Sequence, residues 1–172
     1  IDRRAVALAE IEQAPGGVGD EHAGEQVRVH GLLARRHPER RDLEAAELSA
    51  REWKKVLAAA KICQQAGFQV ISCNANPIGR PKTGEELTTQ VAAMTELGEG
   101  LNALGMRLGV HHHMPEMVNN AREFHYNFRH SRPDVVGFCY DVHWVWKGGI
   151  APLDAMKEYG DRIVTWHLRQ SR

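Results

Sequence analysis

The sequence contains no long apolar run, no excess of charge of either sign and few aromatic residues. No segment of 18 apolar residues occurs and no charged-then-apolar signal opens the chain, so we predict a cytoplasmic protein that binds no membrane. Lysine plus arginine and aspartate plus glutamate both number 22, which gives a formal net charge of zero. Because dedicated nucleic-acid binders are usually basic, we expect no nucleic-acid partner.

Cysteine is also scarce, and no nucleotide-binding signature is present. The three cysteines, Cys63, Cys73 and Cys139, are widely spaced and form no C-x-x-C pair. This pattern favours reduced thiols over a disulfide framework or a zinc ribbon. Neither G-x-G-x-x-G nor a Walker A sequence follows any strand-like segment, which argues against the nucleotide-binding sheets.

The chain divides by composition into residues 1–48 and 49–172. The first part is rich in Arg, Glu, Ala and Gly, and its only plausible strand covers residues 27–33. We predict a divergent or poorly packed N-terminal segment there. In the second part, signals for the start of a helix recur along the chain. Capping boxes are present at Ser49–Glu52 and Thr83–Glu86, and a similar pattern is present at Asn120–Glu123. A chain of 172 residues is long enough for one domain with a core.

Four β-rich segments alternate with helical patterns in the second part. The predicted strands cover residues 68–74, 107–113, 134–141 and 162–168, and the predicted helices end at Gly67, Gly105, before Pro133 and at Gly160. Alternating strands and helices predict an α/β fold with a parallel sheet covered by helices. Two architectures satisfy this pattern, an open doubly wound sheet and a (β/α)8 barrel.

Polar residues mark the end of each predicted strand, and histidine is frequent among them. The strand ends supply Ser72, Asn74 and Asn76, then His111 and His113, then Asp141 and His143, and finally His167. In parallel α/β folds the active site lies at the carboxyl ends of the strands. Seven of the ten histidines lie between residues 111 and 167.

Side-chain alternation selects a subset of these residues for one face. Residues i and i+2 share a face of a strand, so His111 and His113 align while His112 faces the other way. Imidazole and carboxylate groups from neighbouring strands are typical ligands of a divalent metal, so His111, Asp141 and His167 together predict a metal site. His112 and His130 are expected to be solvated or hydrogen-bonded side chains, and Asp141 alone also fits a loop cap.

Three stretches, LGVHHHMPE, VVGFCYDVHWVWKGGIAPLDAMKEYGDRI and VTWHLRQSR, resemble the sugar phosphate isomerase/epimerase group. These proteins are TIM barrels similar to xylose isomerase, and the group includes ketose 3-epimerases and inosose dehydratases. The resemblance covers about residues 52–172 and implies a partial xylose isomerase-like (β/α)8 barrel. About four βα units are clear, and the eighth strand, which supplies a fourth ligand in relatives, is not in this sequence.

The resemblance also implies roles for individual residues. His111, Asp141 and His167 match the metal ligands, and the cofactor is expected to be Mn, Co, Zn or Mg. Glu116 and His143 are the expected acid/base groups. Substrate contacts are expected from His113, Trp144, Arg169 and Asn74. Arg169 replaces a lysine of relatives and would hold a hydroxyl or phosphate. Trp144 and its neighbour Trp146 could instead cover the site or pack under the Gly148–Gly149 turn.

The resulting hypothesis is a metal-dependent isomerase or epimerase of a small sugar or sugar phosphate. The metal would polarise a carbonyl while a side chain moves the neighbouring proton. Alternatives are an inosose dehydratase-type lyase, a metal-dependent phosphodiesterase of damaged DNA, against which the neutral charge argues, and a non-catalytic partial barrel. Open sheet edges would favour self-association of such a partial barrel into a homo-oligomer.

Overall fold

The computed structural model describes residues 5–8 and 54–168, which form one parallel sheet with helices. The strands are β1 (Ala5–Leu8), β2 (Phe68–Asn74), β3 (Arg107–His111), β4 (Val136–Asp141) and β5 (Ile163–His167). All four strands that the sequence predicted after residue 49 are confirmed. The strand predicted at 27–33 and the helix start at Ser49 lie outside the described residues.

The strand order decides between the two architectures. The strands lie in the order β1-β2-β3-β4-β5, and every neighbouring pair is parallel. A doubly wound sheet reverses its order at a switch point, whereas a (β/α)8 barrel adds each strand beside the preceding one. The described strands follow the second rule, and the predicted partial barrel is confirmed.

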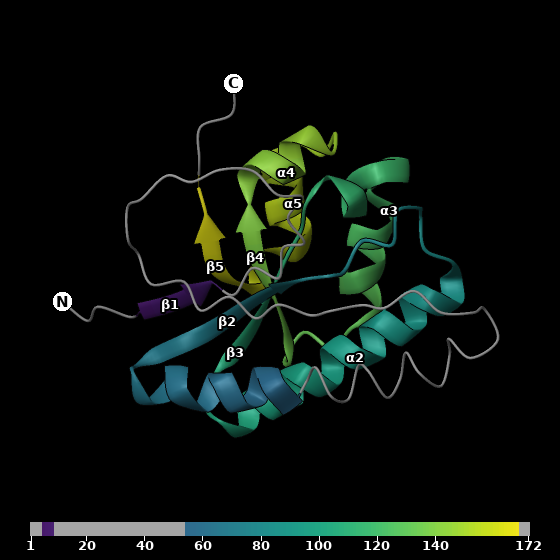
Figure 1. The fold of residues 1–172 in the computed structure, drawn as a ribbon. Coiled ribbons are helices and arrows are strands. Elements are labelled where there is room, and N and C mark those ends of the chain that lie inside the picture. Colours follow the sequence, from purple (N-terminus) through teal and green to yellow (C-terminus); the bar gives the residue numbers. More distant parts are fainter. Residues whose placement is uncertain (1–4, 9–53, 169–172) are drawn as a thin grey trace, which may run out of the picture.

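The helices gather along one side of the sheet. They are a helix over residues 54–65, α2 (Gly84–Ala103), α3 (Met114–His130), α4 (Val142–Lys147), α5 (Pro152–Tyr159) and the 3-10 turn η2 (Gly160–Arg162). In Figure 1 they run from the helix over 54–65 at the bottom, through α2 and α3, to α4 and α5 at the top. The capping box that starts α2, Thr83 with Glu86, is present as predicted.

The two faces of the sheet differ because side chains alternate along each strand. One face is apolar and packs against the helices, with Leu108, Val110, Phe138 and Tyr140 all fully buried in the main core. The other face carries small and polar residues that end in the four polar strand termini: Ser72, Asn74, Gly109, His111, Gly137, Asp141, Thr165 and His167. The apolar face packs against the helices and stabilises the fold, and the polar face carries the candidate site residues.

The start of α3 differs from the prediction. The helix begins at Met114, directly after His113, and not at Asn120. Asn119, Asn120 and Ala121 have φ between 55° and 59°, so the chain breaks the helix there in the left-handed region before continuing to His130. The earlier start arises because Pro115 suits a first helical turn and Glu116 accepts a hydrogen bond from the His113 N–H at 2.7 Å.

His112 was expected to be solvated or hydrogen-bonded, and this prediction is wrong. Its side chain is buried on the helix-facing side, where the rings of Phe124, Phe128 and Phe138 lie 4.8–6.0 Å from it. Within the described residues, neither ring nitrogen has a hydrogen-bond partner. Burial holds the pKa of His112 well below its ordinary value of 6.5, so the ring stays neutral. His130, by contrast, is exposed as predicted.

Replacement of His112 by leucine should stabilise the fold. The change removes two unsatisfied buried nitrogens and keeps a similar volume, which we expect to raise the free energy of unfolding by about 1 kcal/mol. The unfolded chain takes up a proton below about pH 6.5 while folded His112 does not, so the wild type loses stability as pH falls through that value. Urea titrations at pH 8 and pH 5.5 should show a larger gain at pH 5.5. Equal stability of both proteins at both values would contradict this account.

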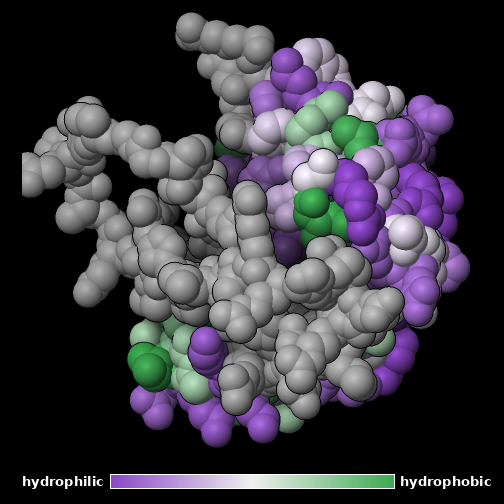
Figure 2. Space-filling model, turned by 45° about the vertical axis from the view of Figure 1, so that its right-hand side comes forward, coloured by the Kyte–Doolittle hydropathy of each residue, from purple (hydrophilic) through white to green (hydrophobic). Residues whose placement is uncertain are grey.

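The surface over α2 and α3 is largely hydrophilic, with scattered hydrophobic residues between the polar ones (Figure 2). The most exposed large apolar side chains of the described residues are Ile62, Leu153 and Leu168. Trp166 packs against Tyr140 and is half exposed. Among the described helices, none combines the length and apolar character needed to cross a membrane.

Candidate metal centre

The sheet register brings the polar strand ends into adjacent pairs. Asn74 of β2 lies beside His111 of β3, and Asp141 of β4 lies beside His167 of β5. Residues that are paired across parallel strands direct their side chains to the same face. All four side chains therefore gather at the carboxyl ends of the strands, where the sequence predicted a site.

The three predicted metal ligands converge. His111 Nε2 lies 3.0 Å from Asp141 Oδ2 and 3.1 Å from His167 Nδ1, and His167 Nδ1 lies 2.9 Å from Asp141 Oδ2. Metal–ligand bonds of about 2.1 Å that meet at about 90–110° place donor atoms about 3.0–3.4 Å apart. The triangle thus has the size that one cation requires. It is the group of potential metal ligands found in the described part of the chain.

The surroundings of this triangle also suit a cation. The side chains of His111 and Asp141 are 4% and 2% exposed, while His167 is 31% exposed, so the cluster is buried except at His167. Two imidazoles and one carboxylate suit transition-metal ions and Zn better than Ca, which prefers oxygen ligands. The residues present therefore fit a divalent metal of the predicted type.

Asp141 caps α4 and also faces the two histidines. Its Oδ1 accepts hydrogen bonds from the backbone N–H groups of His143 and Trp144, at 2.9 and 3.2 Å, and thereby caps α4. Its Oδ2 faces the two histidines. The cap fixes the carboxylate in one orientation, so the second oxygen is held toward the cluster at no further cost in side-chain entropy.

Asn74, which was predicted to contact substrate, contacts the side chains of His111 and His113. Its Oδ1 is 3.0 Å from His111 Nδ1, and its Nδ2 is 2.9 Å from His113 Nδ1. These contacts make Asn74 a partner of two site residues. Sequence reasoning found the position from the strand end but not this arrangement, because an amide gives no periodic signal of its own.

Glu116 lies in the first turn of α3. It is 1% exposed, and its Oε2 accepts the His113 N–H. Burial raises the pKa of the Glu116 carboxyl, and the backbone hydrogen bonds that it accepts oppose this shift. A raised pKa is useful for a group that exchanges protons near neutral pH. The role of Glu116 in acid/base chemistry stays a prediction.

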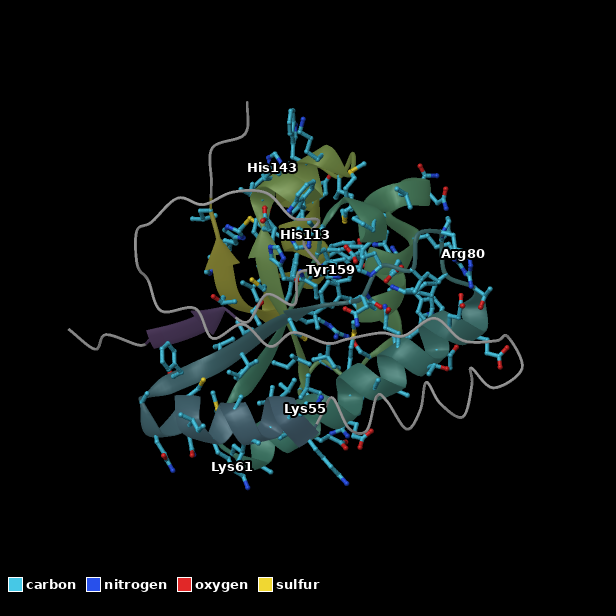
Figure 3. All side chains as sticks on the ribbon, viewed as in Figure 1. Lys55, Lys61, Arg80, His113, His143 and Tyr159 are labelled. Carbon is cyan, nitrogen blue, oxygen red and sulfur yellow. The ribbon has the colours of Figure 1, made fainter. Side chains whose placement is uncertain are left out.

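The remaining predicted residues lie around the rim. His113 and His143 both lie near the carboxyl ends of β4 and β5 (Figure 3). The ring of Trp144 contacts His113 at 5.5 Å and His143 at 4.9 Å between centroids, so Trp144 forms a wall beside the site. Trp146 is 53% exposed on α4. Arg169 lies outside the described residues.

A buried ion pair beside the site was not predicted. Lys82, 8% exposed, contacts Glu123 Oε1 at 2.5 Å, and Gln90 donates to the same oxygen. This pair joins the loop after β2 to α3, the helix that carries Glu116. Lys82 and Glu123 are 41 residues apart in the sequence, so no local pattern could indicate their contact.

Comparisons with solved structures return a sugar phosphate isomerase/epimerase and a xylose isomerase domain protein. A crystal structure of a sugar phosphate isomerase/epimerase from Parabacteroides distasonis superposes with a TM-score of 0.63 at 19% identity, over 72% of this chain and 48% of that one. A xylose isomerase domain protein from Alicyclobacillus acidocaldarius gives 0.53 at 16%, over 73% and 48%. The fold is that of the sugar phosphate isomerase/epimerase group.

A curated relative agrees with this group. An inosose dehydratase from Geobacillus kaustophilus is 33% identical over 69 residues, which are 40% of this chain and 22% of that protein. The chain spans about half the length of the solved neighbours and less of the curated relative. No family model matches the sequence. The resemblance to the isomerase/epimerase group predicted from the three motif stretches is confirmed.

Proposed function

We propose that this protein is a metal-dependent isomerase or epimerase of a small sugar or sugar phosphate, which moves a proton at the carbon next to a carbonyl. The observation that carries the proposal is the triangle of His111 Nε2, Asp141 Oδ2 and His167 Nδ1, with sides of 2.9–3.1 Å at the carboxyl ends of the strands. A divalent cation, when bound, acts as a Lewis acid that stabilises negative charge developing on a substrate oxygen.

The other side chains supply binding and proton transfer. Glu116, with its raised pKa, and His143 on the first turn of α4 are the acid/base candidates. Trp144 offers an apolar wall for the C–H face of a sugar, and His113 offers a hydrogen bond to one of its oxygens. Arg169, beyond β5, is proposed to hold a hydroxyl or phosphate.

A second candidate, dehydration of an inosose, is favoured by the curated relative. That inosose dehydratase is 33% identical to 69 residues of this chain. Dehydration also starts with removal of a proton next to a carbonyl, so the same cluster serves both reactions. The two reactions diverge after proton removal, since an isomerase returns the proton and a dehydratase expels hydroxide as water.

Deuterium exchange tests the proposal and separates the two reactions. The purified chain, stripped with a chelator and reloaded with Mn, Co, Zn or Mg, is incubated in heavy water with a panel of ketoses, sugar phosphates and inososes. We expect deuterium at the carbon next to the carbonyl only in the reloaded protein, and a product of unchanged mass apart from the label. A product lighter by one water would favour the lyase. Exchange that is absent with every metal, or undiminished in His167→Ala, would contradict the proposed function.

A further inference from the structure

We propose that Asn74 sets the tautomers of both His111 and His113, so that one ring presents a lone pair to the cluster and the other presents an N–H. The residue acts through its neighbours and is therefore a positioning residue. The use of these groups toward a metal and a substrate rests on the proposed function. The tautomers themselves are read with Zn²⁺ bound and with no substrate present.

The contact with His111 fixes the first tautomer. Asn74 Oδ1 is a carbonyl oxygen, which can only accept, and it lies 3.0 Å from His111 Nδ1. The proton of the neutral ring is therefore on Nδ1. This leaves Nε2 with a lone pair, and Nε2 is the atom that lies 3.0–3.1 Å from Asp141 and His167. Only a nitrogen with a lone pair can bind a metal ion.

The contact with His113 fixes the opposite tautomer. Asn74 Nδ2 can only donate, and it lies 2.9 Å from His113 Nδ1. His113 Nδ1 therefore holds a lone pair, and the proton is on Nε2.

One amide thus gives two neighbouring imidazoles opposite characters. Their ring centroids are 4.7 Å apart at the carboxyl ends of the strands. His111 Nε2 is suited to a cation, and His113 Nε2–H is suited to an oxygen that accepts a hydrogen bond, such as a sugar hydroxyl or carbonyl. The arrangement favours a ligand that joins an oxygen acceptor to a metal-binding group.

The reversed amide gives a clear competing arrangement. If Asn74 were turned over, its Nδ2 would donate to His111 Nδ1, and His111 Nε2–H would donate to Asp141 Oδ2. That network is self-consistent in a protein without a cation, but it leaves His111 no lone pair for a metal. The two arrangements predict opposite tautomers at both histidines, so one spectrum separates them.

Long-range proton–nitrogen NMR correlations of the full chain, labelled with 15N-histidine, read these tautomers directly. Spectra are recorded with Zn²⁺ bound at about pH 8.5, about two units above the ordinary histidine pKa of about 6.5, and the signals of the two rings are distinguished with His113→Gln. We expect Nδ1–H for His111 and Nε2–H for His113. The opposite result at either ring would overturn the proposal, and this outcome needs no Asn74 variant to fold.

A matched pair of variants tests whether Asn74 is the cause. Asn74→Asp keeps an acceptor for His111 but replaces the donor to His113 by a second acceptor, so His113 should change to Nδ1–H while His111 keeps its tautomer. Asn76→Asp adds the same charge at an exposed position two residues away and should change neither. An unchanged His113 in Asn74→Asp, or a change in Asn76→Asp of the same kind, would overturn the assignment.

Metal affinity provides a second readout. Asn74→Leu removes both contacts and should weaken Zn²⁺ or Co²⁺ binding by about 10–100-fold, as loss of an outer-shell partner usually does. Asn74→Asp should bind at least as tightly as the wild type. Equal affinity of Asn74→Leu and wild type would contradict a positioning role. Should the wild type bind Zn²⁺ but exchange no proton of any substrate, the proposed function fails, and the tautomer spectra still decide the role of Asn74.

Discussion

Asp141→Asn should abolish tight metal binding while the protein stays folded. The substitution replaces Oδ2 by an NH₂ group, which can only donate, at the point where His111 Nε2 and His167 Nδ1 converge. Loss of an outer-shell partner alone costs about 10–100-fold in metal affinity, so loss of a direct ligand should cost at least about 100-fold. Elemental analysis after dialysis and titration with Co²⁺ would measure the effect.

The fold should survive because the cap on α4 survives. The carbonyl oxygen of the substituted side chain can still accept the backbone N–H groups of His143 and Trp144, as Oδ1 of Asp141 does now. Asparagine and aspartate cap helices about equally well, so the free energy of unfolding of the metal-free protein should change by less than about 1 kcal/mol.

Asp154→Asn is the matched control for Asp141→Asn. Asp154 lies on α5 with its side chain 65% exposed, and it forms a surface ion pair with Lys157. The control carries the same change of charge and should bind metal like the wild type. Wild-type affinity in Asp141→Asn, or an equal loss in both variants, would show that the triangle is not the metal site.

Much of the fold could be predicted because it depends on local patterns. Thr83 and Glu86 form the expected capping box, and Gly105 has the positive φ of 70° that a helix end favours. Leu87, Met94 and Leu101 recur at helical spacing, and all three are buried on one face of α2. In each case residues a few positions apart determine the structure, so the sequence displays the cause directly.

The convergence of His111, Asp141 and His167 could be predicted for a different reason. His111, Asp141 and His167 are far apart in the sequence, but each ends a strand, and parallel strands bring their carboxyl ends to one edge. The topology therefore supplied the long-range information. It could not supply the orientation of the Asn74 amide or the Lys82–Glu123 pair, which depend on side-chain positions in space.

His112 shows where this reasoning fails. Alternation correctly placed it opposite His111 and His113, on the face that the helices cover. Because histidine is polar, a polar environment was expected for His112. Its place in the strand instead puts it on the apolar face. His112 is buried on the apolar face because the strand cannot turn its side chain outward without also turning His111 and His113 away from the site.

The close approach of α2 to the start of β4 predicts a large loss of stability in Gly98→Ala. Gly98 is buried on α2, and an added Cβ would overlap the carbonyl oxygen of Val135 and lie 2.9 Å from its carbonyl carbon. A backbone carbonyl cannot rotate away as a side chain can, so the helix must move off the sheet. Overpacking of this kind typically costs about 1–3 kcal/mol, and occasionally more.

The gain in helix propensity does not offset this cost. Alanine stabilises a helix interior by about 1 kcal/mol relative to glycine, whereas the added Cβ would meet main-chain atoms of Val135 that have no room to move. We therefore expect a net loss of about 1–2 kcal/mol in urea-induced unfolding. Gly84→Ala is the control on the same helix, because an added Cβ there meets nothing within 4 Å. It should leave stability unchanged or slightly raised. If Gly98→Ala were as stable as Gly84→Ala, α2 could not lie this close to Val135.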